Sequence, residues 1–143
     1  MLCEDRQQWV FVYRFLIQNG VPGGRIRAQV SQAGRGSGEQ FVREQYPKEV
    51  TEYRRRATSL NVALVVVQDC DNSTVAQTRA RLETAVGRRE DERIAILLPR
   101  RNIETWIRFL TDRAVVDEQV RYPKLRRESE CHDAVDRLAA KPE

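Results

Sequence analysis

Two segments of the chain, 61–68 and 93–98, are apolar at nearly every position. Strands of this kind are covered on both faces, which is typical of a parallel sheet, so we predict two buried strands there. Segment 25–30 alternates apolar and polar residues, which predicts a half-exposed strand. Three apolar residues at 1–3 indicate a very short first strand.

Segments with the hydrophobic spacing of helices separate these strands. The first of them is apolar nearly all the way round, which indicates burial on more than one side or a protein partner. In the second, Pro47 is expected to kink or split the helix. A glycine-rich stretch, 32–38, is expected to form a flexible loop. The predicted helices cover 6–18, 39–60, 71–86, 102–110 and 129–140.

The alternation of strands and helices predicts an α/β fold. We expect an open, mostly parallel, Rossmann-like sheet of four strands with helices on both faces. The 143 residues suffice for one domain with one core. No apolar run approaches the ~20 residues that span a bilayer, so we expect no membrane association. Three widely spaced cysteines, in no metal-ligand pattern, predict free thiols in the cytoplasm.

Acidic residues follow three of the predicted strands. Asp69 and Asp71 end the third strand. Glu4 follows the first strand, and Glu104 lies in the first helical turn after the fourth. Because ligands of open α/β sheets bind at the carboxyl ends of the strands, we expect these side chains to meet at one edge. Carboxylates packed together repel one another, and Mg²⁺ relieves the repulsion, so the sequence predicts a divalent-metal site.

Each of these acids also has an ordinary structural explanation. Asp71 is well placed to cap the helix that follows it, and Glu104 in a first turn is favoured by the helix dipole. Glu4, near a terminus, can simply be solvated. Asp69 is the hardest to explain in this way, because it is not needed as a cap. Cys70, between the two aspartates, is expected to point to the opposite face as a small core residue.

Arginine dominates the basic residues, since 22 of the 25 are Arg and three are Lys. The guanidinium fork binds phosphate through two hydrogen bonds, so the clustered arginines permit nucleic-acid binding, although a solvated surface explains any single pair. Arg100 and Arg101, just before Glu104, are candidate phosphate ligands, and a solvated basic turn is the alternative. His132 is the only histidine, which argues against a histidine triad or a zinc site.

Three motifs carry a resemblance to a known family. They are Glu4 after a short strand, Asp69 and Asp71 after a run of valines, and Glu104 after the next strand. In this order they resemble a TOPRIM domain, the topoisomerase–primase fold of topoisomerases, bacterial primases and nucleases of the overcoming-lysogenization-defect (OLD) group. Asp5 departs from the pattern, because it stands where the family often has glycine.

A further stretch sharpens the resemblance. Residues 94–99, followed by 102–106, are most similar to small stand-alone TOPRIM-like proteins of bacterial defence loci. The resemblance covers about residues 1–112, which leaves 113–143 as a polar C-terminal extension with a short helix. Gln68 stands where the family usually has an apolar residue.

The resemblance implies a nuclease that cleaves phosphodiesters with Mg²⁺ or Mn²⁺, acts on DNA rather than RNA, and serves in anti-phage defence. It implies that Asp69 and Asp71 hold one or both ions. Glu4 would complete the first site or act as general base, and Glu104 would support the second ion. Lys124 would neutralise transition-state charge, as a lysine does in related nucleases. Family resemblance also suggests a homodimer or an ATPase partner.

Other functional classes compete with this interpretation. The aspartate pair also resembles the nucleophile motif of haloacid-dehalogenase-like phosphatases, but there it follows the first strand, and Ser73 replaces the usual Thr or Val. A nucleotide-sugar transferase would be longer, and a receiver domain would need a lysine after a later strand. The main alternative is a binding or regulatory subunit whose acids are vestigial. The apolar helix 6–18 and Trp106 favour such a protein interface.

Overall fold

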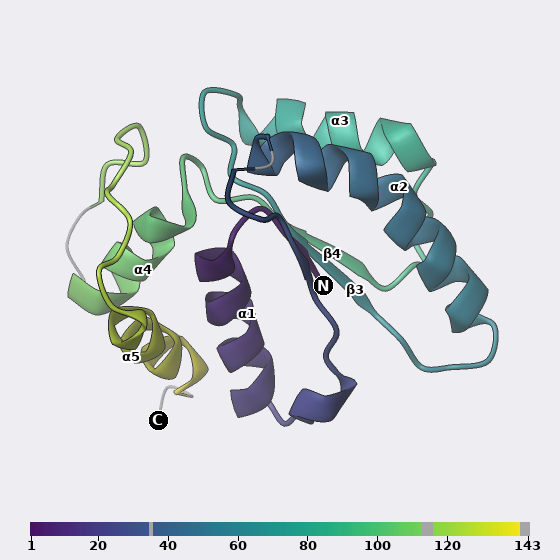
Figure 1. Cartoon of the computed structure of the whole chain (residues 1–143), viewed down its shortest axis with the longest axis horizontal. Coiled ribbons are helices and arrows are strands. Elements are labelled where there is room, and N and C mark those ends of the chain that lie inside the picture. The colour runs from purple at the N-terminus through teal and green to yellow at the C-terminus, as the bar shows by residue number, and fades with distance from the viewer. Residues whose placement is uncertain (35, 113–115, 141–143) are drawn as a thin grey trace.

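The computed structural model describes residues 1–34, 36–112 and 116–140. Four parallel strands form one open sheet at its centre (Figure 1). The first strand in the chain lies inside the sheet, between the second and the third. In spatial order the strands are β2 (Gln29–Val30), β1 (Leu2–Cys3), β3 (Leu64–Val67) and β4 (Ile94–Leu97).

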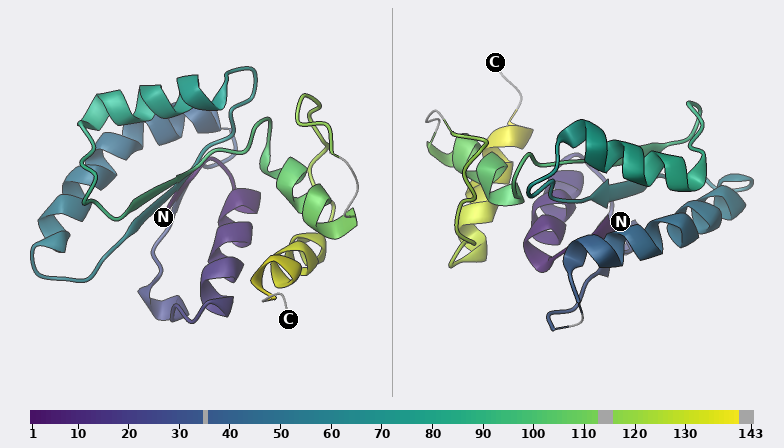
Figure 2. Two further views of the ribbon diagram at one scale, coloured as in Figure 1. Left: turned by 180° about the vertical axis from the view of Figure 1, so that it is seen from behind. Right: turned by 90° about the horizontal axis from the view of Figure 1, so that it is seen from above.

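Helices cover both faces of this sheet (Figures 1 and 2), which confirms the predicted α/β fold. The second and third helices lie over one face, whereas the first, fourth and fifth gather on the other. No helix in the described ranges is both long and apolar enough to cross a lipid bilayer. The helices are α1 (Arg6–Gln18), α2 (Gly38–Ala57), α3 (Val75–Val86), α4 (Ile103–Asp112) and α5 (Glu128–Ala139).

Each central strand contributes to two separate cores, because successive side chains of a strand point to opposite faces. Val66 packs under α2 and α3 in a cluster with Tyr46, whereas Val67 packs in a cluster with Phe11 of α1. Val66, Val67 and Tyr46 are 0% exposed. Full burial of such side chains contributes ~1.5–3 kcal/mol each. This two-sided burial explains why β3 has no polar position.

The edge strand β2 is shorter than the predicted strand 25–30. Only Gln29–Val30 pairs in the sheet, and Gly23–Arg25 forms a 3₁₀ turn instead. Pro22 precedes this turn, and its carbonyl accepts a hydrogen bond from the Arg25 N–H at 2.9 Å. The turn takes Arg25 out of the predicted strand, and Ala28 on its expected apolar face is exposed, so residues 26–28 lack the burial that the alternating pattern predicted.

Helix α2 runs unbroken through Pro47, so the expected split does not occur. An interior proline costs a helix about 3 kcal/mol. Val42, Tyr46, Val50 and Tyr53 of the same helix are all buried in the core between α2, α3 and the sheet. Their packing offsets the cost, and tertiary contacts therefore decide the length of this helix.

The C-terminal extension joins the fold through α5, which packs against α1 and α4. Cys131 and Val135 of α5 are 1% and 0% exposed, so one face of this helix belongs to the core. Within the predicted extension 113–143, residues 113–115 and 141–143 lie outside the described part of the chain.

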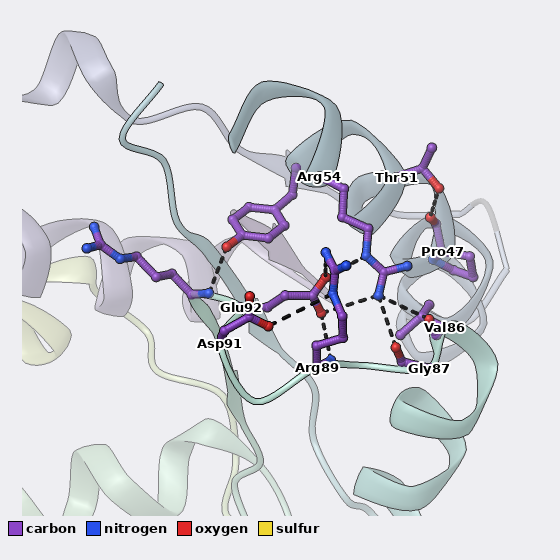
Figure 3. Close-up of polar contacts among 10 residues, drawn as sticks. Pro47, Thr51, Arg54, Val86, Gly87, Arg89, Asp91 and Glu92 are labelled. Carbon is purple, nitrogen blue, oxygen red and sulfur yellow. Dashed lines mark hydrogen bonds and ion pairs between the residues drawn. The ribbon is translucent and has the colours of Figure 1, made fainter. Parts of the chain in front are cut away.

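A buried carboxylate anchors the amino end of β4 (Figure 3). The Glu92 side chain is 3% exposed and accepts hydrogen bonds from Arg54 Nε at 2.5 Å and the Arg89 backbone N–H at 2.9 Å. The hydrogen bond from Arg54 is the main reason why the pKa of Glu92 is lowered to about 2. Arg54 also donates to the carbonyls of Val86 and Gly87 at the end of α3. This network ties α2 to the α3–β4 connection.

Candidate functional site

The four predicted acids line one cavity at the carboxyl ends of the strands. Glu4 directly follows β1, Asp69 and Asp71 follow the neighbouring β3, and Glu104 lies in the first turn of α4 beyond β4. All four border a cavity of about 530 Å³, which we call the acidic cavity. Acids from different strand ends, 33 to 100 residues apart in the chain, therefore meet because parallel strands end at the same edge.

Gln8 of α1 connects two of these acids. Its amide Nε2 donates to Asp69 Oδ1 at 2.9 Å and to Glu4 Oε2 at 3.4 Å, and its Oε1 accepts from the Glu4 backbone N–H at 2.9 Å. The side chain is inaccessible to solvent. Asp5, the N-cap of α1, directly follows Glu4, so the first turn of α1 lies next to the end of β1 and places Gln8 beside Glu4. A single amide thus fixes the carboxyl ends of β1 and β3 relative to each other.

Gln7 gives a third acid a similar connection. Its Nε2 donates to Glu104 Oε1 at 2.7 Å, while its Oε1 accepts from the Leu125 backbone N–H at 3.2 Å. Glu104 is 3% exposed, so this amide satisfies a carboxylate that water hardly reaches. The same bond holds the chain after residue 120 close to the acidic cavity.

Burial destabilises the ionised form of the carboxyl groups in the acidic cavity. Burial, followed by the charge of Asp69, raises the pKa of Glu4 to about 8. Burial also raises the pKa of Asp69 to about 7, although the hydrogen bond from Gln8 opposes the shift. The pKa of Glu104 is raised for the same main reason. Within the described part of the chain, the buried Glu4 Oε1 has no hydrogen-bond partner. The cluster is therefore costly unless protons or a cation neutralise it.

Asp71 does not cap the following helix, so that structural explanation is wrong. The cap of α3 is Thr74, which forms a reciprocal capping box with Gln77. Asp71 has φ of 47°, in the left-handed region that a residue with a Cβ adopts at a cost of roughly 1–2 kcal/mol. Its carboxylate lies 3.4 Å from Arg121 Nη1. The chain thus accepts a strained backbone at a residue that borders the cavity.

Arg100 and Arg101 hold the loop that carries Asp71. Arg100 Nη1 donates to the Ser73 carbonyl at 2.6 Å, and Arg101 Nη1 donates to the Asp71 carbonyl at 2.7 Å and to Asn72 Oδ1 at 2.6 Å. Neither arginine is among the residues that line the acidic cavity. Their role as phosphate ligands stays a prediction, while their structural role is to fix this loop.

Lys124 lies at the rim of the acidic cavity. Its Nζ is 2.6 Å from Oδ2 of Asp5, the residue whose other oxygen caps α1. Burial lowers the pKa of Lys124, but the hydrogen bond and charge of Asp5 raise it more, so the side chain stays cationic. Asn102 secures this segment, because its Nδ2 donates to the Tyr122 carbonyl at 2.7 Å. Through Lys124, the C-terminal extension thus places a positive charge at the acids. The catalytic role of Lys124 stays a prediction.

Helix α2 begins against the first acid, and Gly38 makes this contact possible. A Cβ at position 38 would lie 2.7 Å from Glu4 Cβ and 2.9 Å from the Glu4 carbonyl oxygen. Such distances are too short for real Cβ contacts, and the backbone on the Glu4 side cannot simply rotate away. Gly38 therefore sets the position of Glu4, although the sequence predicted only a flexible loop for 32–38.

We expect Gly38→Ala to destabilise the protein by about 1–2 kcal/mol, because the overpacking cost exceeds the helix preference of alanine. Urea denaturation measures this change. Gly24→Ala is the matched control, since a Cβ there meets no atom within 4 Å. Equal stability of the two variants would show that the contact with Glu4 relaxes freely.

The chemistry of the acidic cavity fits a hard divalent cation, since Mg²⁺ and Mn²⁺ prefer carboxylate oxygens. The unpartnered Glu4 Oε1 is an acceptor that such an ion would satisfy. Among the described residues, however, no three His, Cys, Asp or Glu side chains are arranged to hold one ion. Asp69 and Glu104 are instead bonded to Gln8 and Gln7. The carboxylate oxygens are suitable ligands, but Asp69 and Glu104 would have to give up their hydrogen bonds from Gln8 and Gln7 to bind the ion.

Cys70 is 3% exposed and belongs to the core on the α2–α3 side, as the strand alternation predicted. Gln7, Gln8 and Gly38 were not predicted as parts of the site. The two glutamines did leave a signal, because they are the polar pair that precedes the apolar run of α1, three and four residues after Glu4. Comparisons with protein-family models, curated proteins and solved structures found no match.

Proposed function

We propose that this protein is a Mg²⁺- or Mn²⁺-dependent, TOPRIM-like nuclease that cleaves phosphodiester bonds. One observation carries the proposal: carboxylates from three separate strand ends border a single cavity, and burial raises the pKa of three of them. A fold gains no stability from such an arrangement, so a functional role is the better explanation. The three acids are Glu4, Asp69 and Glu104.

Under this proposal, Glu4, Asp69, Asp71 and Glu104 would hold the metal. A bound divalent ion would activate water and stabilise the leaving oxygen of a phosphodiester. Gln8 holds the carboxylates at the ends of β1 and β3 together before an ion binds, and Asp69 would give up its hydrogen bond from Gln8 to coordinate the ion. Lys124, whose ammonium already compensates acidic charge, would neutralise the charge that develops on the phosphate.

The substrate and setting of the proposed nuclease follow from the same reasoning. We propose DNA rather than RNA as substrate and anti-phage defence as the role, because the sequence motifs resemble TOPRIM-like proteins of defence loci. A reducing cytoplasm suits the three cysteines, which are all free and buried. A homodimer or an ATPase subunit is the proposed partner.

Nicking of supercoiled plasmid DNA with Mg²⁺ or Mn²⁺ tests the proposal. We expect wild-type protein to nick and Asp69→Ala to lose more than the ~10–100-fold that changes in the outer shell of a metal site cost. Asp133→Ala, which removes an exposed carboxylate of α5, is the matched control and should nick normally. Equal activity of wild type and Asp69→Ala would place the nicking outside the acidic cavity and end the proposal.

Calorimetric titration with Mn²⁺ separates the nuclease from the alternative of a non-catalytic subunit. The proposal expects binding that Asp69→Ala removes, accompanied by proton release, because carboxyl groups with raised pKa must ionise to bind a cation. The subunit alternative expects no binding at millimolar Mg²⁺ or Mn²⁺. The absence of a preformed three-ligand group among the described residues is the observation that keeps this alternative open.

A further inference from the structure

A second cavity adjoins the acidic cavity and is lined by four basic and three acidic residues, so it carries a small excess of positive charge. It measures about 470 Å³ and lies between the loop after β2 and the segment that leads into α5. The two cavities share Glu4, Asp5, Gly38 and Lys124 in their walls, so they are neighbours along one surface. We call the second one the cationic cavity; its basic residues are Arg6, Lys124, Arg126 and Arg127.

The charges of the cationic cavity do not cancel. Asp5 is paired with Lys124, and Glu128 is paired with Arg6 at 2.7 Å. These pairs leave two arginines that face no close carboxylate of the cavity. Within the described residues, Arg127 has only a 4.0 Å contact to Glu130 of α5, and Arg126 has no ion pair. A polyanion that entered the cavity would therefore meet two exposed guanidinium groups.

We propose that the cationic cavity binds the sugar–phosphate backbone of a single nucleic-acid strand, with Arg126 and Arg127 as phosphate ligands next to the acidic cavity. The inference rests on the proposed nuclease function and adds how the site holds the strand that is cut, which is compatible with nicking of one strand of a plasmid. A phosphate held by the two arginines would place a neighbouring phosphodiester of the same strand at the shared wall. Guanidinium groups suit this task because they bind phosphate through two parallel hydrogen bonds.

The size and lining of the cavity decide which nucleic acid fits. A volume of about 470 Å³ falls within the ~300–1,000 Å³ of pockets that take small molecules, so the cavity has room for one or two nucleotides of a single strand. The described lining residues include no aromatic side chain on which a base could stack. Binding should therefore read the backbone and be independent of base sequence.

Fluorescence anisotropy of the full chain with labelled single-stranded oligonucleotides, in EDTA so that no cleavage occurs, tests the inference. We expect the double variant Arg126→Ala/Arg127→Ala to bind roughly tenfold more weakly, with a salt dependence about 1.4 units shallower, since each phosphate contact on a single strand contributes ~0.7. Arg126→Lys/Arg127→Lys should restore most of the binding. Arg55→Ala/Arg56→Ala, at the far end of α2, removes the same charge elsewhere and should bind normally.

The inference would be overturned by unchanged binding of the alanine variant, by an equal loss in the Arg55/Arg56 control, or by a duplex of the same sequence that binds as tightly as the single strand. Competition by polyglutamate at the same charge concentration would also overturn it, because the surface would then select acidic polymers in general. The assay needs no metal and no cleavage. If the wild-type protein binds single strands in this way but does not nick plasmid DNA, the proposed nuclease function is wrong and the proposed binding site is still supported.

Discussion

Raising the pH from about 4 to 8 in EDTA is expected to lower the stability of this protein. Burial raises the pKa of Asp69 to about 7 and that of Glu4 to about 8, from ordinary values of 3.8 and 4.5. Across this range the folded protein holds protons that the unfolded chain has already released. The free energy of unfolding therefore falls as the pH rises. The contribution of these two groups is highest below their ordinary pKa values and lowest above their pKa values in the folded protein.

The variant Asp69→Asn should remove much of this loss, because the amide carries no charge and its Oδ1 can still accept the bond from Gln8. One pKa unit corresponds to ~1.4 kcal/mol, so at pH 8 we expect Asp69→Asn to be more stable than wild type by about 2–4 kcal/mol. Urea denaturation at each pH measures the effect. Asp133→Asn controls for the lost charge at an exposed position of α5. If the free energy of unfolding stays constant or rises toward pH 8, the explanation that burial raises the pKa of these carboxyl groups is wrong.

Replacing Glu92 by alanine is expected to cost about 2–3 kcal/mol, because charged hydrogen bonds are worth more than neutral ones and Arg54 would lose its buried acceptor. Asp91→Ala is the matched control one residue away (Figure 3), since its side chain is 82% exposed and 3.9 Å from Arg89. Urea denaturation at pH 7 should show the cost for Glu92→Ala alone.

The same network gives a pH dependence of opposite sign. The folded pKa of Glu92, about 2, lies below its ordinary 4.5, so its contribution is complete above pH 4.5 and is lost as the pH falls toward 2. The stability difference between wild type and Glu92→Ala should shrink over that interval. A difference that persists at pH 2 would show that packing, and not the ionised carboxylate, explains the cost.

The sheet could be predicted from the sequence wherever burial alone decides the structure. The apolar runs of β3 and β4 need cover on both faces, and a parallel sheet between helices, as found here, provides it. Prediction failed where a local preference competes with packing. At β2 the turn after Pro22 shortened a plausible strand, and at Pro47 the buried face of α2 overrode a residue that breaks most helices.

The acids of the candidate site were also predictable, because strand ends converge by topology. Their immediate partners were not, since a hydrogen bond depends on side-chain positions that no sequence pattern specifies. Gln8 looks like an ordinary first-turn residue until α1 folds back on β3, and Gly38 looks like part of a loop until α2 meets Glu4. The positive charge that the C-terminal extension brings to these acids could not be predicted either, because it depends on the contact between Lys124 and Asp5.

The interior position of β1 has a consequence for biosynthesis. Its two residues pair on one side with β2 and on the other with β3, more than sixty positions further along. Closing such a span costs loop entropy that only the later contacts repay. During translation Glu4 emerges long before Glu104 and Lys124, so the carboxylates meet only after most of the chain has left the ribosome.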